Sequence, residues 1–434
     1  MKYLTILCDG MADTPSDALY GKTPMEVANK PVMNRLAAVC THVVLDGVST
    51  WRYGSRLGTA RTTPEGMKPG SDVANMSVLG YNPADYYTGR SPLEAASIGI
   101  DLGASDVAFR CNFVTLSDGG EYGDKTMLDY CAGDIPTEDA EVLLNDVAGL
   151  FRQIRKDKIV NIEFHKGVGY RHCMVWRGGA SLLKNTVFGM TTPPHDIADK
   201  PVTEAYAKLA AIPEFGIIAE LMKKSYEMLS VHPVNIKRAA AGERQANSIW
   251  IWGEGTAAQF PDFTMCTGKR GVIISAVDLL RGIGKVANMR TPEVPGVTGY
   301  IDTNFTGKAD EAIESFKNGD DYVYIHIEAP DECGHRGELD NKVRSIEIID
   351  KDVLKPVLNY LDDAGEPYRV LICPDHYTPV AIKTHTDTPV PFLLYDSRDG
   401  EAPVSEKGMF SEITAEASGN HIEQGYTLRE LLLG

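Results

Sequence analysis

The chain has no long hydrophobic run. Its first apolar run, residues 3–8 (YLTILC), ends after six residues at Asp9, and no other run approaches the length of a membrane span. A helix needs about 20 apolar residues to cross a bilayer, and the first run is too short for the apolar region of a signal peptide. We therefore expect a cytoplasmic protein that does not bind membranes.

Paired cysteines are also missing. The eight cysteines stand at positions 8, 40, 111, 131, 173, 266, 333 and 373, without a CxxC pair, and several lie within apolar runs. A cysteine in an apolar run behaves as a small hydrophobic residue, and scattered positions argue against a disulfide framework. The pattern predicts a reducing compartment, which again indicates the cytoplasm.

Positive charge is scarce. The chain has 43 Lys and Arg residues against 60 Asp and Glu residues, a formal net charge of −17. Nucleic acids and anionic membranes repel such a protein, so we expect neither as a partner. No GxxxxGKS or GxxxxGKT loop is present, and residues 253–255 (GEG) lack the rest of a dinucleotide fingerprint. An anionic small-molecule substrate would need local arginine, lysine or metal ions to overcome the negative field.

The length of 434 residues exceeds one ordinary hydrophobic core, while 43% apolar and 24% charged residues are typical of a soluble globular protein. Short apolar runs followed by helical patterns predict an α/β fold with a mostly parallel sheet between helices. Residues 86–244 differ, because they have amphipathic stretches and basic residues without acidic strand ends. We predict a core formed by residues 1–85 and 245–434, resuming with residues 248–252 (SIWIW), and an inserted α/β or α+β domain at 86–244.

Acidic residues and histidines follow three strand-like runs. Residues 322–327 (YVYIHI) lead to Asp331 and His335, residues 3–8 lead to Asp9, and residues 369–373 (RVLIC) lead to Asp375 and His376. Asp331 and His335 are four positions apart, so one helical turn would put both on the same face. In open parallel sheets, chemistry collects beyond the carboxyl ends of the strands. We therefore expect these side chains to share one cleft.

His385 follows nine residues after His376 and can be a further ligand. An Asp after a strand is often only a turn former or helix N-cap, and a lone His is often a core or surface residue. Three of the ten histidines, however, lie beside Asp at strand ends or in the loop that follows, which favours a metal site. Mixed His and carboxylate ligands favour manganese or zinc over calcium, and magnesium where carboxylates dominate.

A serine lies at a predicted helix start within residues 68–81 (KPGSDVANMSVLGY). A Pro-Gly turn precedes it, Asp72 opens the helix and Gly80 ends it, so Ser71 lies at or just before the helix N-terminus. The free backbone N–H groups and the helix dipole there stabilise an alkoxide or a phosphate. The alternative is an ordinary N-cap serine.

These motifs, in their order along the chain, resemble the alkaline phosphatase superfamily. Within it, the sequence is similar to the archaeal-type branch of the cofactor-independent phosphoglycerate mutases. The similarity covers nearly the whole chain, including PGSDVANMSVLGYNP (69–83), TGRSPLEAASIGI (88–100), DVAFRCNFVT (106–115), HPVN (232–235), ANSIWIWGEG (246–255), GVIISAVDLLRGIG (271–284) and PDECGHRGELDNK (330–342). The resemblance implies an alkaline-phosphatase-like core with an inserted cap domain, and the interconversion of 3-phosphoglycerate and 2-phosphoglycerate without 2,3-bisphosphoglycerate.

The resemblance also implies a role for each ligand. The nucleophile that becomes phosphorylated would be Ser71. One divalent ion, most readily manganese, would be held by Asp331, His335 and His385. The other would be held by Asp9, Asp375, His376 and Ser71. One ion would lower the pKa of the serine and the other would neutralise the transferring phosphoryl group, while closure of the inserted domain would exclude water.

Basic residues are the candidates for holding the phosphate and carboxylate of the substrate. They are Arg90, Arg110, Arg171, His172, Lys269 and Arg270. Arginine suits bidentate contact with either anion, although such residues also form ordinary surface ion pairs. The inserted domain lacks the Arg-x-Asp-Arg element of better known cofactor-independent mutases. The alternatives are therefore a related phosphotransferase such as a homoserine kinase, a phosphatase, or a binding protein without catalysis.

Overall fold

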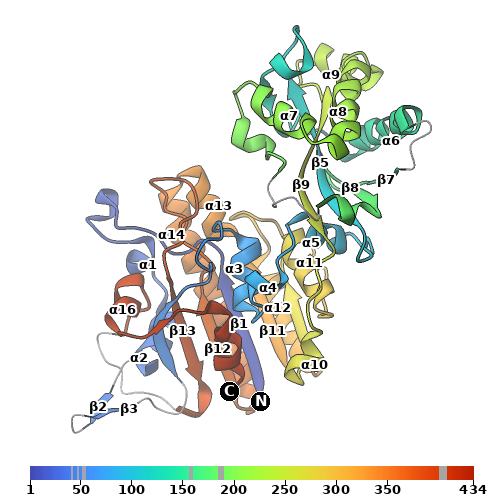
Figure 1. The fold of residues 1–434 in the computed structure, drawn as a ribbon. Coiled ribbons are helices and arrows are strands. Elements are labelled where there is room, and N and C mark those ends of the chain that lie inside the picture. The colour runs from blue at the N-terminus through green and yellow to red at the C-terminus, as the bar shows by residue number, and fades with distance from the viewer. Residues whose placement is uncertain (41–42, 46–47, 51–54, 156–159, 184–189, 400–407) are drawn as a thin grey trace. The chain divides into compact units, whose positions relative to one another are not determined.

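The computed structural model describes the chain apart from residues 41–42, 46–47, 51–54, 156–159, 184–189 and 400–407. It falls into two compact units (Figure 1). Unit 1 is Met1–Tyr87 together with Gln259–Gly434, and unit 2 is Thr88–Ala258. The joints lie at residues 87/88 and 258/259, whereas the sequence analysis placed them at 85/86 and 244/245.

A seven-stranded sheet in the order β10-β11-β1-β12-β13-β4-β14 forms the centre of unit 1. Its strands are β1 (Lys2–Cys8), β4 (Arg56–Ala60), β10 (Gly271–Ile274), β11 (Tyr322–Ile327), β12 (Tyr368–Cys373), β13 (Val390–Asp396) and β14 (His421–Ile422). β10, β11, β1 and β12 are parallel, β13 is antiparallel to both neighbours, and β4 is parallel to β14. A separate antiparallel pair is β2 (Val43–Leu45) with β3 (Val48–Thr50).

Helices lie on both sides of this sheet (Figure 1). They are α1 (Pro24–Val27), α2 (Pro31–Cys40), α3 (Ser71–Val78), α4 (Pro83–Tyr86), α10 (Phe263–Thr267), α11 (Asp278–Val286), α12 (Phe305–Lys317), α13 (Ala329–Arg336), α14 (Leu339–Ile348), α15 (Lys355–Ala364), α16 (Glu412–Ala417) and α17 (Leu428–Leu433). The apolar spacing over residues 339–358 predicts one helix, and the structure has α14 and α15 joined by a π-helical segment, Ile349–Leu354.

Alternation along the strands sends side chains to opposite faces of the sheet. Leu4 and Ile6 of β1 lie in a buried hydrophobic cluster that includes Phe305 of α12 and Ile346 of α14. Each such side chain contributes about 1.5–3 kcal/mol relative to its exposed state. The intervening positions of β1 face the other side, and Asp9 continues that side just beyond the end of the strand. A core that covers both faces explains why these strands are almost continuously apolar.

Unit 2 is built on an antiparallel sheet. Its strands are β5 (Val107–Leu116), β6 (Met127–Asp129), β7 (Asn161–His165), β8 (Arg171–Arg177) and β9 (Ser248–Thr256), in the order β6-β5-β8-β7 with β9 also paired to β5. Its helices are α5 (Ser91–Ser97), α6 (Thr137–Arg155), α7 (Thr203–Ala210), α8 (Gly216–Leu229) and α9 (Pro233–Ala240). The expectation that the core resumes at residues 248–252 is wrong, because β9 pairs with β5 of unit 2. An apolar run of strand length does not reveal which sheet it joins.

The predicted fold class, a mostly parallel sheet between helices with an inserted second unit, is confirmed. Among the described residues, no helix is both long enough and apolar enough to cross a membrane.

Candidate active site

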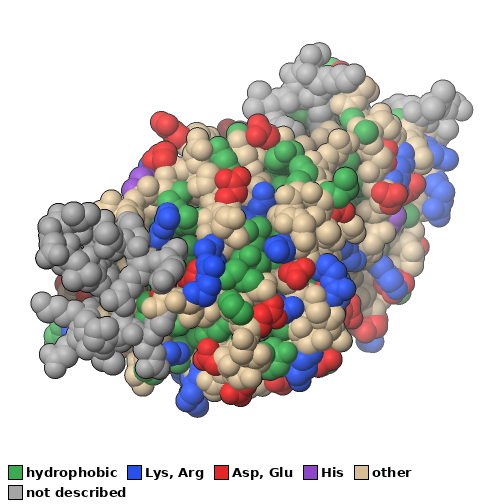
Figure 2. Space-filling model, turned by 90° about the horizontal axis from the view of Figure 1, so that it is seen from below, with side chains coloured by type: hydrophobic (Ala, Val, Ile, Leu, Met, Phe, Trp, Pro, Cys, Tyr) green, Lys and Arg blue, Asp and Glu red, His purple; other side chains and the backbone are tan. Residues whose placement is uncertain are grey.

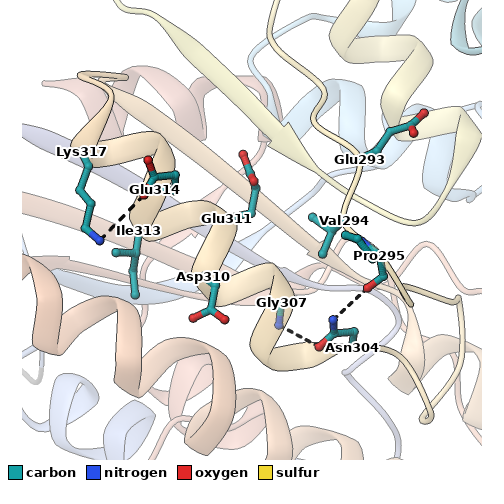
Figure 3. Close-up of a pocket in the computed structure, with 10 residues that line it drawn as sticks. All are labelled: Glu293, Val294, Pro295, Asn304, Gly307, Asp310, Glu311, Ile313, Glu314 and Lys317. Atoms are coloured by element: carbon teal, nitrogen blue, oxygen red, sulfur yellow. Dashed lines mark hydrogen bonds and ion pairs between the residues drawn. The ribbon is translucent and has the colours of Figure 1, made fainter.

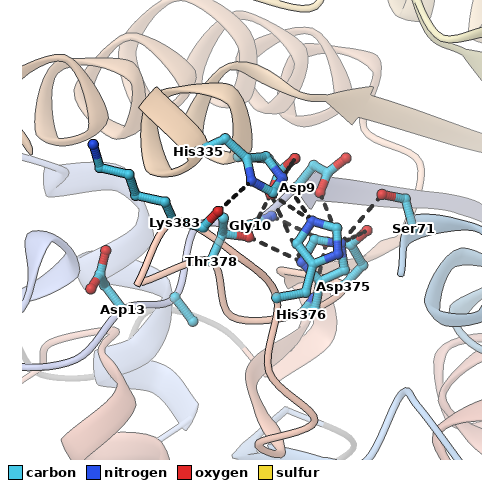
Figure 4. A network of polar contacts seen from close by, with 12 residues as sticks. Asp9, Gly10, Asp13, Ser71, His335, Asp375, His376, Thr378 and Lys383 are labelled. Carbon is cyan, nitrogen blue, oxygen red and sulfur yellow. Dashed lines mark hydrogen bonds and ion pairs between the residues drawn. The ribbon is translucent and has the colours of Figure 1, made fainter. Parts of the chain in front are cut away.

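The predicted ligands gather at one edge of the unit 1 sheet (Figure 4). Asp9 follows β1, and Asp375 and His376 follow β12. Asp331 lies on α13 just after β11. These three strands are parallel, so their carboxyl ends meet at the same edge. The structure brings together all seven predicted ligands: Asp9, Ser71, Asp331, His335, Asp375, His376 and His385.

The first set is Asp331, His335 and His385. The Nε2 atoms of His335 and His385 lie 3.3 Å and 3.4 Å from the two carboxylate oxygens of Asp331 and 2.9 Å from each other. His335 Nδ1 lies 3.0 Å from the carbonyl oxygen of Lys383. A carbonyl only accepts hydrogen bonds, so Nδ1 carries the proton and Nε2 presents its lone pair to the other two side chains. Three ligand atoms therefore converge on one point, as divalent metal binding requires.

The second set surrounds His376. Its Nε2 atom lies 3.3 Å from Ser71 Oγ, 3.4 Å from Asp375 Oδ2 and 3.5 Å from Asp9 Oδ1. Asp9, Asp375 and His376 are almost fully buried. Two carboxylates, one hydroxyl and one imidazole thus lie together here, and such an oxygen-rich set suits a hard divalent ion.

The charges in this centre fit bound cations. Asp9 Oδ1 is buried, and no described residue donates a hydrogen bond to it. Burial, together with the nearby charges of Asp375 and Asp331, raises the pKa of Asp9 well above its usual value. Burial opposes ionisation of Asp331 too, yet the neighbouring imidazoles of His335, His385 and His376 hold its pKa well below the usual value. Divalent ions would supply the positive charge that these crowded carboxylates need.

The carboxylates of Asp9, Asp375 and Asp331 each have a further side-chain partner that was not predicted from the sequence. His326 Nε2 lies 3.0 Å from Asp9 Oδ2, Asn75 Nδ2 donates to Asp375 Oδ2 at 2.8 Å, and Thr378 Oγ1 donates to Asp331 Oδ1 at 2.5 Å. The available signals were a polar residue inside an apolar strand, an Asn one helical turn after Ser71, and a Thr two residues after His376. Such outer partners fix the orientation of metal ligands.

Ser71 is the first residue of α3, and Gly70 is its N-cap. The interpretation of Ser71 as an ordinary N-cap is therefore wrong, and its hydroxyl lies beside His376 instead. Asn75, one turn later, donates from Nδ2 to the Ser71 carbonyl oxygen at 2.8 Å and accepts a hydrogen bond from Tyr324. The nucleophile candidate is thus held at the positive end of a helix and tied to the Asp375 ligand.

Three of the predicted basic residues form a cluster in unit 2. Glu94 pairs with Arg90 at 2.8 Å and with Arg110 at 3.0 Å. Burial opposes it, but the charges of Arg110, Arg90 and Arg171 lower the pKa of Glu94. Arg110 also stacks 4.4 Å above the ring of Trp252. Guanidinium groups gathered on one face of a sheet suit an anionic ligand.

His172 does not join this cluster. In the β5–β8 register it pairs with Cys111, whereas Arg171 pairs with Asn112, so the two neighbours face opposite sides. His172 lies in the core against Phe113, where burial lowers its pKa to about 4. The predicted substrate contact of His172 stays a prediction, and this orientation does not support it.

Lys269 and Arg270 lie away from the predicted ligands. They precede β10 and so lie at the amino ends of the parallel strands, opposite the ligand edge. Lys269 lies 5.5 Å from the ring of Tyr3 at the start of β1, and Arg270 pairs with Asp320 at 3.6 Å. Figure 2, a view from below Figure 1, shows acidic and basic side chains interspersed on that face.

A separate groove of about 530 Å³ runs along α12 (Figure 3). Its lining includes the carboxylates of Glu293, Asp310, Glu311 and Glu314 beside Lys317. It contains none of the predicted ligands, and an acidic surface repels a phosphorylated substrate. The candidate active site is therefore the ligand edge of the sheet.

The chain is similar to known proteins over its whole length. A family model described as 2,3-bisphosphoglycerate-independent phosphoglycerate mutase matches residues 53–235. A relative of that name from Methanothrix thermoacetophila is 42% identical over 433 residues, and one named as probable from Geobacter sulfurreducens is 44% identical over 435; each match covers 100% of both chains. A solved structure from Pyrococcus horikoshii is 25% identical, with a TM-score of 0.75 over 100% of this chain and 96% of that one. The chain belongs to the family of 2,3-bisphosphoglycerate-independent phosphoglycerate mutases.

Proposed function

We propose that the chain interconverts 3-phosphoglycerate and 2-phosphoglycerate by transient phosphorylation of Ser71, without 2,3-bisphosphoglycerate. The observation that carries the proposal is the position of Ser71 Oγ, 3.3 Å from His376 Nε2 among converging carboxylates. The full-length relatives that bear the mutase name support the choice of substrate.

Two divalent ions would complete the centre. Asp331, His335 and His385 would hold one ion, and Asp9, Asp375, His376 and Ser71 would hold the other. When bound, the ions supply positive charge that lowers the pKa of the serine hydroxyl and neutralises the transferring phosphoryl oxygens. The mixture of imidazole and carboxylate favours manganese, with magnesium and zinc as alternatives.

Ser71 takes part in both halves of the reaction. Its deprotonated Oγ attacks phosphorus in line, the bond from phosphorus to the C3 oxygen breaks, and that oxygen gains a proton. The resulting glycerate reorients, its 2-hydroxyl loses a proton and attacks the phosphoserine, and the bond to Oγ breaks. The N-terminus of α3 stabilises the negative charge on Oγ and on the phosphoserine in both steps.

Unit 2 would supply substrate binding. The cluster of Arg90, Arg110 and Arg171 offers planar donors that match phosphate and carboxylate groups. These donors suit a phosphorylated small molecule as the substrate, and we expect neither a nucleic acid nor a membrane as a partner.

Eight free cysteines, most of them buried, support a cytoplasmic location.

The test is a direct assay of the purified chain. Manganese and 3-phosphoglycerate are supplied without bisphosphoglycerate, and 2-phosphoglycerate is measured. We expect product from the wild-type chain, with phosphoserine at Ser71 by mass spectrometry. The substitution Ser71→Ala should abolish both signals, because no other described hydroxyl contacts His376 Nε2.

Ser77→Ala is the matched control, since Ser77 is buried on the same helix and its hydroxyl forms no hydrogen bond with any described residue. It should keep near-normal activity. If the Ser71→Ala variant still turns over substrate, Ser71 is not the nucleophile. If the chain forms phosphohomoserine from homoserine and ATP but no 2-phosphoglycerate, its function is that of a homoserine kinase and not of a mutase.

A further inference from the structure

A histidine that belongs to neither predicted ligand set lies beside the candidate metal centre. His326 is on β11, and its side chain is completely buried. Its Nε2 atom lies 3.0 Å from Asp9 Oδ2, and its Nδ1 atom lies 3.1 Å from Ser275 Oγ, just beyond β10. The imidazole therefore links Asp9 to the end of a neighbouring strand.

The direction of these hydrogen bonds follows from Asp9. An ionised carboxylate only accepts hydrogen bonds, so the neutral imidazole of His326 carries its proton on Nε2 and donates it to Asp9 Oδ2. His326 Nδ1 is then an acceptor and receives the hydroxyl proton of Ser275. The Ser275 oxygen in turn accepts a hydrogen bond from the backbone N–H of Val277 at 3.0 Å.

This bond determines which oxygen of Asp9 stays available. Oδ2 is engaged by His326, whereas Oδ1 receives no hydrogen bond from any described residue. Oδ1 is the oxygen that lies 3.5 Å from His376 Nε2, in the set that includes Ser71. Rotation of the carboxylate would break the bond to His326 and turn Oδ1 away from that set.

We propose that His326, oriented by Ser275, is a positioning residue that presents Asp9 Oδ1 to the divalent ion bound beside Ser71. The inference rests on the proposed function for the presence of that ion. It assigns His326 a donor role and not that of a ligand, although one of its nitrogens lies within 4.8 Å of ligand atoms of Asp9 and Asp375.

Two substitutions separate the donor from a ligand. In His326→Gln, the side-chain amide reaches about as far as Nε2 and can still donate to Asp9, but the imidazole is lost. In His326→Asn, the shorter amide replaces Nδ1 beside Ser275 and leaves Asp9 Oδ2 without its donor. The affinity for manganese alone is measured by isothermal titration and by electron paramagnetic resonance of free Mn²⁺, without substrate.

We expect His326→Asn to raise the dissociation constant of one of two manganese ions by roughly 10- to 100-fold, the usual effect of losing an outer partner of a ligand. His326→Gln should restore most of that affinity. Ser275→Ala should weaken the same ion less, and Ser315→Ala, a buried serine of unit 1 that contacts no predicted ligand, should leave both ions unchanged.

Wild-type affinity in folded His326→Asn would overturn the proposal. Equal losses in the Gln and Asn variants would also overturn it, because they would make the imidazole itself a ligand or a packing element. A wild-type chain that binds no manganese would reject the metal centre of the proposed function as well. A wild-type chain that binds two ions but makes no 2-phosphoglycerate would reject only the proposed reaction.

Discussion

Thr378 links the two predicted ion sites, so its replacement is a sharp test of the centre. Its hydroxyl donates to Asp331 Oδ1 at 2.5 Å and lies 3.2 Å from His376 Nδ1. Because the hydroxyl proton goes to Asp331, the oxygen accepts from His376 Nδ1–H. His376 Nε2 is then left with its lone pair toward Ser71, as a metal ligand requires.

The substitution Thr378→Val removes the hydroxyl while keeping the shape of the side chain. A hydrogen bond to a charged group contributes about 1.5–3 kcal/mol, and one between neutral groups about 0.5–1.5 kcal/mol. At about 1.4 kcal/mol for each factor of ten, the ion held by Asp331 should bind roughly 10- to 100-fold more weakly. The ion held by His376 should lose affinity less, since only the neutral bond orients that ligand.

Manganese titration of the purified chain measures both affinities, and Thr378→Ser is the control because it restores the hydroxyl. The serine variant should bind both ions more tightly than the valine variant. The reasoning fails if Thr378→Val binds both ions as the wild type does. It also fails if the serine variant is as weak as the valine variant, because Thr378 Cγ2 would then act through its packing against Gly334.

Three further predictions follow from single residues. In Gly10→Ala, the new Cβ would lie 2.5 Å from Asp331 Oδ1 at a φ of +59°, so unfolding free energy measured by denaturant should fall by about 3 kcal/mol. Arg110→Lys keeps the charge but loses the planar fork, so KM for 3-phosphoglycerate should rise about tenfold with kcat nearly constant, and an unchanged KM would remove Arg110 from the substrate site. For Asp396, burial raises the pKa, but hydrogen bonds from Arg398 and Arg369 outweigh burial and lower the pKa to about 2. A carboxylate with a depressed pKa stabilises the fold above its unfolded pKa of about 4, and that stability is lost as pH falls toward 2. Asp396→Asn should therefore cost about 2 kcal/mol at pH 7 and flatten thermal stability between pH 4 and pH 2, whereas an unchanged acid profile would contradict the linkage.

The convergence of the candidate ligands could be predicted from sequence because a local rule places them. Polar residues that directly follow parallel strands meet at one edge, whatever the rest of the fold does. Asp9, Asp331 and Asp375 satisfy that rule, and Ser71 follows the comparable rule for helix N-termini. The same rule, applied consistently, excludes Lys269 and Arg270, because they precede a strand.

The outer donors and the substrate residues depend on information that is not local. In the sequence, His326 is one more residue of a buried strand. Its contacts with Asp9 and Ser275 form only because β1 and β10 flank β11 in the sheet. Arg171 and His172 are neighbours in sequence, and only the pairing register with β5 decides which of them faces the arginine cluster. A shift of one residue would exchange their roles, and nothing in the sequence pattern fixes that register.

The donors around the three carboxylates show how the site is prepared for cations. His326, Asn75 and Thr378 each engage one oxygen, which reduces the cost of burial without neutralising any charge. Burial and the repulsion that remains raise the pKa of Asp9, while the neighbouring imidazoles outweigh burial and lower the pKa of Asp331. The fold thus fixes the directions of the candidate ligands, and ions bound there would recover the stability that is lost to crowded carboxylates.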